Sequence, residues 1–135
     1  MRYILKMAKK ILKYGVGVDG HTVVIKGCFS RVCKIMTQDY FPRIWMEVDE
    51  ENYDEVEVEI RCVGTGWEFK SENAGQYIDS CIDGEGYVWH YYMDTPVFLS
   101  KEEKRQAEQY MRYQELIADM YNSNIFVDEP KIDLF

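Results

Sequence analysis

The chain reads Val56-Glu57-Val58-Glu59-Ile60-Arg61-Cys62-Val63 and then Gly64-Thr65-Gly66-Trp67. Apolar and charged residues alternate along it, so they point to opposite faces of an extended backbone. A strand of this kind buries its apolar face in a core and leaves its charged face in water. The two glycines that follow Val63 predict that the strand ends there and that the chain turns.

Other short segments of strand character lie on both sides of this one. We expect strands over residues 11–18, 21–26, 31–37, 43–48, 76–82 and 87–93, the first beginning near Lys10. Asp19-Gly20 is of the type that favours a hairpin turn, so the first two segments are predicted to pair with each other. Asp83 to Gly86 predicts a second hairpin, whose aromatic second arm we expect to be covered on both faces. Pro42 is assigned to a turn, because proline is barred from central ladder positions.

The C-terminal part has helical spacing. Ser100 with Glu103 three residues later matches a capping box, and apolar residues then recur at helical intervals to about Asn122. The sequence therefore predicts a mostly β (α+β) fold: an antiparallel sandwich or half-open barrel of about seven strands with one C-terminal helix. We expect a β-rich domain over residues 1–96, with the helix and an extended tail (97–135) packed on it. The apolar stripe also predicts a homodimer through the helix (100–122) or the tail (125–135).

Composition limits the class of protein. With 135 residues, 47% of them hydrophobic, the chain is long enough for one domain with a real core. No apolar run is long enough to span a membrane, and the basic N-terminus lacks the apolar centre of a signal peptide, so we expect a soluble cytoplasmic protein. The four cysteines are expected to be reduced thiols. The spacing of Cys28 and Cys33 is not that of a tight zinc knuckle, so we expect no metal and no cofactor.

Charge is distributed unevenly along the chain. The net charge is −8, yet residues 1–46 hold nine Lys/Arg against two Asp/Glu, and eight carboxylates fall between Glu47 and Glu59. Such a block repels nucleic acid and suits a basic protein partner, or it only keeps the protein soluble. The candidate protein-binding residues are Glu47, Asp49, Glu50, Glu51, Asp54, Glu55 and Glu57.

A second set of residues has the chemistry of a nucleotide pocket. Arginine can hold a phosphate, glycine amides can approach one, and an aromatic ring can stack on a base. The candidates are Arg43, Trp45, Arg61, Gly64, Thr65, Gly66 and Trp67, on the expectation that the strand of Arg43 pairs with the strand of Arg61. Two arguments oppose this interpretation. Glu57 and Glu59 lie on the same face as Arg61, so their carboxylates would oppose a phosphate, and the aromatic rings can fill the core instead of lining a pocket.

No enzymatic motif is recognisable. His21 and His90 have no nearby nucleophile, and Gly64-Thr65-Gly66 is not followed by the helix or the Lys-Ser/Thr pair of a phosphate-binding loop. We therefore expect a protein that is not an enzyme.

Several short stretches together resemble a known family. They are Lys10 to Tyr14, Val32 to Met36, Pro42-x-x-Trp45, Val63-Gly64-Thr65-Gly66 and Val88-Trp89-His90. In this order they resemble a small uncharacterised domain family that recurs in bacteriophage and prophage genomes, over residues 9 to 93. The resemblance implies a phage accessory protein in the cytoplasm of an infected bacterium, and it assigns no residue a role.

Three functions follow as expectations. The first is a non-enzymatic inhibitor, anti-CRISPR-like or related, that binds a component of host antiviral defence having a basic surface. The second is sequestration of a nucleotide second messenger of host defence, and the third is an unrecognised enzyme. We expect no direct contact with nucleic acid or membrane.

Overall fold

The computed structural model describes residues 8–70, 74–95 and 97–123. The chain divides into two compact units, residues 1–100 and 101–135. The described part of the second unit is one helix, α2 (Lys101–Ser123). The predicted helix is therefore present, whereas its packing on the β domain stays a prediction and the predicted tail (125–135) lies outside the described residues.

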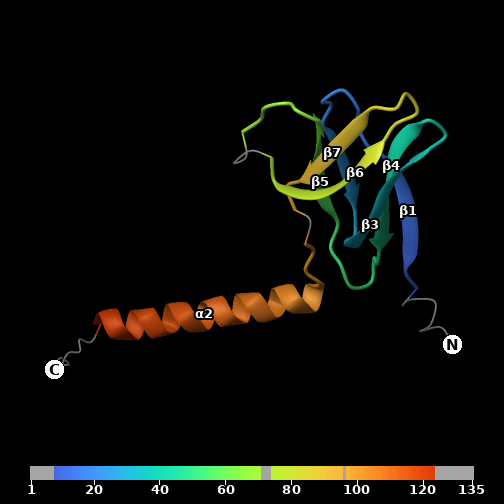
Figure 1. The fold of residues 1–135 in the computed structure, drawn as a ribbon. Helices are drawn as coiled ribbons and strands as arrows, with labels where there is room; N and C mark the ends of the chain where they lie inside the picture. The colour runs from blue at the N-terminus through green and yellow to red at the C-terminus, as the bar shows by residue number, and fades with distance from the viewer. Residues whose placement is uncertain (1–7, 71–73, 96, 124–135) are drawn as a thin grey trace. The chain divides into compact units, whose positions relative to one another are not determined.

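The first unit contains two antiparallel sheets (Figure 1). The first sheet has the order β1-β4-β3 and the second has the order β2-β5-β7-β6. The strand bounds are β1 (Lys10–Gly15), β2 (Val23–Gly27), β3 (Phe29–Gln38), β4 (Phe41–Val48), β5 (Val56–Gly64), β6 (Gln76–Ile82) and β7 (Val88–Met93). The predicted fold class is confirmed: the protein is mostly β, and the two sheets do not close into a barrel.

The core lies between the inner faces of the two sheets. Every second residue of β4, β5 and β7 contributes to it, as the period of a strand requires. The large side chains of these three strands that are less than 2% exposed are Pro42, Ile44, Met46, Val58, Ile60, Tyr91 and Met93. Tyr91 brings a polar group into this layer, and its hydroxyl donates to the carbonyl oxygen of Gly17 at 2.6 Å.

The aromatic strand β7 is fully buried on only one face, whereas we expected both faces to be covered. Trp89, Tyr91 and Met93 are buried, whereas His90 and Tyr92 are half-buried on the other face. The second sheet has only its inner face against the first sheet, so the alternate residues of β7 face outward.

The predicted first hairpin is wrong in its pairing but right in its turn. Asp19 and Gly20 have φ of 55° and 81°, and His21 N donates to Val18 O at 3.0 Å, so the turn forms. However, β1 pairs with β4 and β2 pairs with β5. The connection leads the chain from one sheet to the other, with Val16 and Val18 packed against the core. Turn chemistry alone therefore predicted the bend but not the partner of either strand.

Pro42 is inside β4, a central strand, and not in the preceding turn as expected. Asp39 and Tyr40, both with positive φ, make that turn by themselves. Proline has no backbone N–H to donate to a neighbouring strand. This is tolerated at Pro42 because β1 ends at Gly15, opposite Arg43, so Pro42 lies just beyond the last pair of the β1–β4 ladder.

The two sheets are joined along one side, where β3 lies beside β6. Ile35 N donates to an oxygen of Asp79 at 3.3 Å across this seam. At the end of the seam the two hairpin tips touch, since Gly84 N donates to Tyr40 O at 2.8 Å. The β3–β4 and β6–β7 hairpins therefore support each other.

Asp83 organises the β6–β7 turn. One carboxylate oxygen accepts from the backbone N of Glu85 at 2.8 Å and of Tyr87 at 3.0 Å. The other accepts from the indole N–H of Trp89 at 2.8 Å. The bond from Trp89, followed by the backbone donors, lowers the pKa of Asp83 below its ordinary value.

This arrangement predicts how acid affects stability. Because the folded pKa of Asp83 is lowered, its contribution is complete above the unfolded pKa of about 3.9 and is lost as pH falls through the folded value. Asp83→Asn should therefore lower the free energy of unfolding at pH 7, and the difference from wild type should shrink toward pH 2–3. Urea unfolding of both proteins across this range measures it. A difference that does not change with pH would contradict the assigned role of the carboxylate.

Candidate functional site

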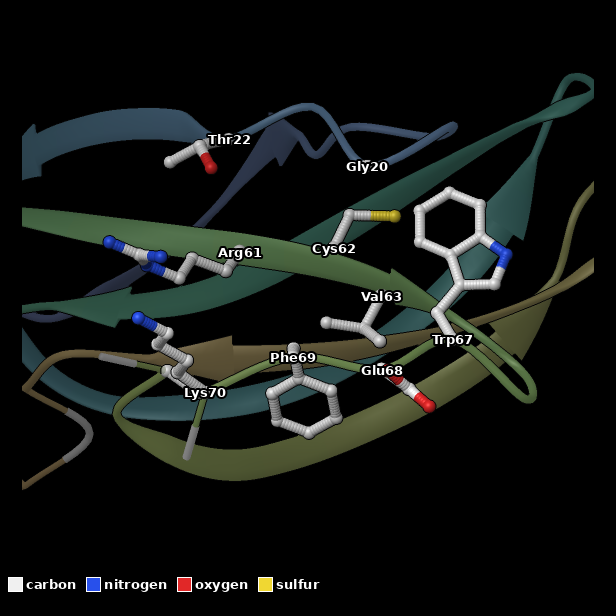
Figure 2. A pocket seen from close by; sticks show the side chains of 10 residues that line it. Gly20, Thr22, Arg61, Cys62, Val63, Trp67, Glu68, Phe69 and Lys70 are labelled. Carbon is white, nitrogen blue, oxygen red and sulfur yellow. The ribbon is translucent and has the colours of Figure 1, made fainter. Parts of the chain in front are cut away.

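A pocket of about 300 Å³ lies beside the last residues of β5 (Figure 2). It exists because β2 begins opposite Ile60, so residues 61–64 of β5 extend beyond β2 on that side. Two connections border the resulting space: the one that contains Gly20 and Thr22, and the segment 67–70 that follows β5. The lining residues are Gly20, Thr22, Arg61, Cys62, Val63, Trp67, Glu68, Phe69, Lys70 and Ala74.

One end of the pocket is cationic. Figure 2 shows the guanidinium of Arg61 and the ammonium of Lys70 at this end, and the carboxylate of Glu68 away from both. Among the described residues, Arg61 forms an ion pair with Glu59, at 3.4 Å. Both side chains of that pair are about 40% exposed, and exposed pairs contribute about 0–1 kcal/mol, so the arginine remains available to an incoming anion. Within the described residues, Lys70 has no ion-pair partner.

The other end is aromatic, and Gly64-Thr65-Gly66 serves to position its ring. Trp67 N donates to Gly64 O at 3.1 Å, closing a turn in which Gly66 has φ of 86°. The indole of Trp67 lies directly on Gly64, where a Cβ would come within 2.6 Å of the ring. Gly64 thus makes room for Trp67, so Gly64 and Gly66 have structural roles in the site.

Phe69 extends this aromatic surface onto the outer face of the second sheet. Its ring lies 5.1 Å from the ring of Tyr92, which in turn lies 5.3 Å from Tyr77. His90 joins the cluster through its ring nitrogens, one 2.8 Å from the Thr65 hydroxyl and the other 3.4 Å from the Tyr77 hydroxyl. His90 and Tyr92, the rings of β7 that point away from the core, therefore lie in one cluster beside the pocket.

The structure brings some of the predicted pocket residues together and separates others, while their binding of a ligand stays a prediction. Arg61 and Trp67 line it, and Gly64 supports it. Arg43 and Trp45 are in β4, which pairs with β1 and β3, so they lie in the first sheet and not beside Arg61. The error was the assumption that strands adjacent in sequence pair with each other.

Sequence reasoning missed Thr22, Phe69 and Lys70. The polar composition of residues 68–74 predicts only an exposed loop. An aromatic residue next to a lysine in that segment, Phe69-Lys70, was the available signal.

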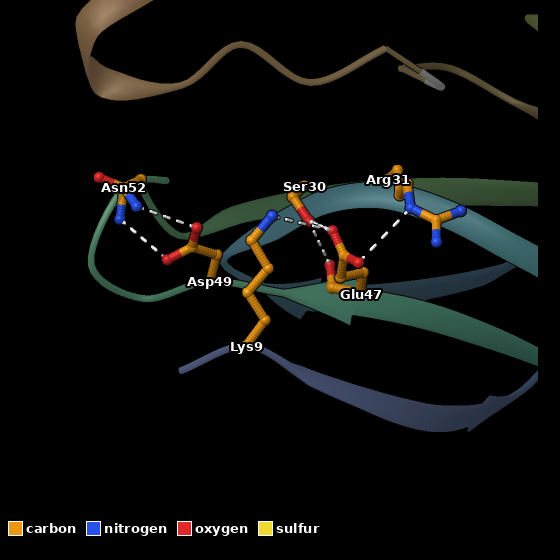
Figure 3. A network of polar contacts seen from close by, with 6 residues as sticks. All are labelled: Lys9, Ser30, Arg31, Glu47, Asp49 and Asn52. Atoms are coloured by element: carbon orange, nitrogen blue, oxygen red, sulfur yellow. Dashed lines mark hydrogen bonds and ion pairs between the residues drawn. The ribbon is translucent and has the colours of Figure 1, made fainter. Parts of the chain in front are cut away.

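Two members of the predicted acidic surface have structural roles instead (Figure 3). Asp49 is 2% exposed, and its carboxylate accepts from the backbone and side-chain nitrogens of Asn52 at 3.2 and 3.1 Å. Glu47 accepts from the Ser30 hydroxyl at 2.6 Å and pairs with Lys9 at 3.7 Å and Arg31 at 3.5 Å. The bond from Ser30, helped by the two cations, lowers the pKa of Glu47.

The other acidic residues remain at the surface. They are Glu50, Glu51, Asp54, Glu55 and Glu57, all exposed. Glu55 forms an ion pair with Lys26, whose Nζ lies 4.0 Å from Oε1 of Glu55. The acidic surface is thus reduced to the loop after β4 and the first outward residue of β5.

The thiols and acidic side chains do not form a metal site in the described part of the chain. Cys28, Cys33, Cys62 and Cys81 are not joined in disulfides, and burial raises the pKa of Cys62 and Cys81. Over residues 8–70, 74–95 and 97–123, no three His, Cys, Asp or Glu side chains are placed to hold a metal ion. Within the same ranges, no helix has the length and apolarity needed to cross a membrane.

Comparison with known proteins identifies the family. No curated protein and no solved structure matches the chain. A family model described as a domain of unknown function, DUF7352, matches residues 7–99. Because this match covers more than half of the sequence, the chain belongs to the DUF7352 family.

Proposed function

We propose that the protein acts by binding and that its pocket receives a small phosphorylated ligand carrying a ring, such as a nucleoside phosphate. The observation that carries this proposal is the polarity of the pocket, with Arg61 and Lys70 at one end and Trp67 at the other. A phosphate requires cationic donors, and a base requires a flat apolar surface. The resemblance to phage proteins supports a biological role for such binding, namely sequestration of a nucleotide signal of host defence.

The size of the pocket restricts the ligand. A volume of about 300 Å³ is at the lower end of the range for small-molecule sites. It suits a mononucleotide or one unit of a larger cyclic nucleotide. The hydroxyl of Thr22, which also lines the pocket, can donate to a phosphate or sugar oxygen.

Removing either cation should weaken binding. Arg61→Ala and Lys70→Ala should each cost about 1.5–3 kcal/mol, or roughly 10- to 150-fold in affinity, because each loses a charge-assisted hydrogen bond. Titration calorimetry with nucleoside mono-, di- and cyclic phosphates measures the affinity. Inorganic phosphate and the bare nucleoside, tested separately, should bind much more weakly than the nucleotide.

Lys26→Ala is the matched control for this experiment. Lys26 is an exposed cation of the same sheet, in β2, and it does not line the pocket. Its loss should leave the affinity unchanged. If the wild-type protein shows neither heat nor thermal stabilisation with any of these compounds at millimolar concentration, the pocket is not a nucleotide site.

A second candidate function is supported by the acidic loop. Glu50 and Glu51 are exposed and no hydrogen bond or ion pair engages them within the described residues. Such a surface suits inhibition of a host defence protein through a basic patch on that protein. In this case the partner is a protein and the pocket is not required.

Charge reversal tests this second function. Glu50→Lys with Glu51→Lys should slow association with the host protein captured from lysate, and raising the salt concentration should weaken the wild-type complex steeply. The matched control is Glu108→Lys with Glu115→Lys, which makes the same charge change in α2. Surface plasmon resonance gives the association rates. Equal rates for all three proteins would mean that the acidic loop is only a solvated surface.

A further inference from the structure

The outer face of the first sheet gathers cations from all three of its strands. β4 alternates, so Ile44 and Met46 point into the core while Phe41, Arg43, Trp45 and Glu47 point outward. Residues directly opposite each other on paired strands share a face, which adds Lys13 from β1 and Arg31 and Lys34 from β3. Lys9 joins them through its ion pair with Glu47. The cations of this outer basic face are Lys9, Lys13, Arg31, Lys34 and Arg43.

Aromatic and apolar side chains lie among these cations. Trp45 is in the centre, with Lys13 opposite it on one neighbouring strand and Lys34 opposite it on the other. Phe41, at the start of the same strand, is 53% exposed, and Met36, opposite Arg43, is 45% exposed. The outer basic face therefore offers rings and flat apolar groups in alternation with positive charge.

The positive charge of this face is only partly compensated by protein carboxylates. Glu47 lies on the face and engages Lys9 and Arg31 (Figure 3). Asp79 comes from β6, the strand of the second sheet that lies beside β3, and its carboxylate oxygen is 3.9 Å from Nζ of Lys34. Among the described residues, Lys13 and Arg43 have no carboxylate partner. Lys13 donates to the side-chain oxygen of Gln38, and Nε of Arg43 is buried without any acceptor.

We infer that the outer basic face binds single-stranded nucleic acid. Phosphates can occupy the cationic positions while bases stack on Trp45 and Phe41, the combination of charge and aromatic platform that single strands require. Within residues 8–70 and 74–95 the face is a sheet surface, without a helix or ribbon that projects to enter a duplex groove, so a single strand is favoured over a duplex. This site is separate from the nucleotide pocket, which lies at the β5 end of the other sheet.

The acidic total charge does not prevent this contact. The expectation of no nucleic-acid binding rested on the net charge of −8 and on the acidic block. At physiological salt the screening length is about 8 Å, so charges elsewhere on the protein act only weakly at this face. The total charge slows the approach of a polyanion, whereas the local arrangement decides whether it is held.

Fluorescence anisotropy with labelled oligo-dT and oligo-U, each 12 nucleotides long, tests the inference. The wild-type protein should bind both, and the duplex of matched length should bind less tightly. Lys13→Ala with Lys34→Ala should reduce the magnitude of the slope of log K against log salt by about 1.4, since each phosphate contact on a single strand contributes about 0.7. Trp45→Ala should weaken binding on the order of 5- to 150-fold, and Trp45→Phe should restore much of it.

Two controls complete the experiment. Lys26→Ala with Lys101→Ala removes the same number of exposed cations from β2 and α2, and it should leave the oligonucleotide affinity unchanged. Polyglutamate and vesicles containing phosphatidylserine replace the nucleic acid with other polyanionic surfaces. The inference is overturned if the wild-type protein binds no oligonucleotide at 20 mM salt. It is equally overturned if polyglutamate or the vesicles bind as tightly as the oligonucleotides. The same holds if the first-sheet variants, once thermal melting has shown that they are folded, bind oligonucleotide as tightly as the wild type.

Discussion

The structure depends on the apolar layer between the two sheets. Ile44 and Met46 of β4 and Ile60 of β5 are fully buried in it, and each is followed by a residue that must point to the opposite side. Because the period of a strand is two, a slip of one residue would exchange the whole buried set for the charged set. Burying this layer therefore fixes the register of the central strands. It also determines which side chains are presented to solvent.

Two outer surfaces of different chemistry follow from this constraint. On β4 the outward residues include Arg43 and Trp45, and on β5 they include Glu59 and Arg61. The first surface collects cations from the basic N-terminal third of the chain. The second combines a cationic pocket with the rings of β7 that do not enter the core. The uneven charge along the sequence thus becomes an uneven charge in space.

The elements of this fold were largely predictable from the sequence, because alternation and turn residues are local signals. The strand 56–63, the β6–β7 hairpin and the helix all form close to the expected bounds. The pairing of strands was not predictable in the same way, since β1 with β4 and β2 with β5 are contacts between distant segments. Asp19-Gly20 shows the difference: it forms the expected turn, yet the turn joins two sheets and not two paired strands.

The candidate site shows the same division. Trp67 and Arg61 were recognised because they are close together in the sequence, and Arg43 and Trp45 were added only through a wrong pairing. Asp49 and Glu47 were counted with the acidic surface because burial and the ion pairs with Lys9 and Arg31 depend on tertiary structure. Side-chain chemistry could be assigned from sequence, whereas the grouping of side chains into sites required the sheets.

The three tryptophans allow the central claim, that two separate outer surfaces bind different ligands, to be tested in one spectrum. Trp45 is on the outer basic face, Trp67 is at the pocket, and Trp89 is in the core with its N–H bound to Asp83. Their indole N–H signals in a ¹H–¹⁵N correlation spectrum should respond separately. Oligo-dT should shift the Trp45 signal, and a nucleoside phosphate should shift the Trp67 signal more than that of its neighbour Trp89. If both ligands move the same indole signal, or if neither moves any, the account of two binding surfaces is wrong.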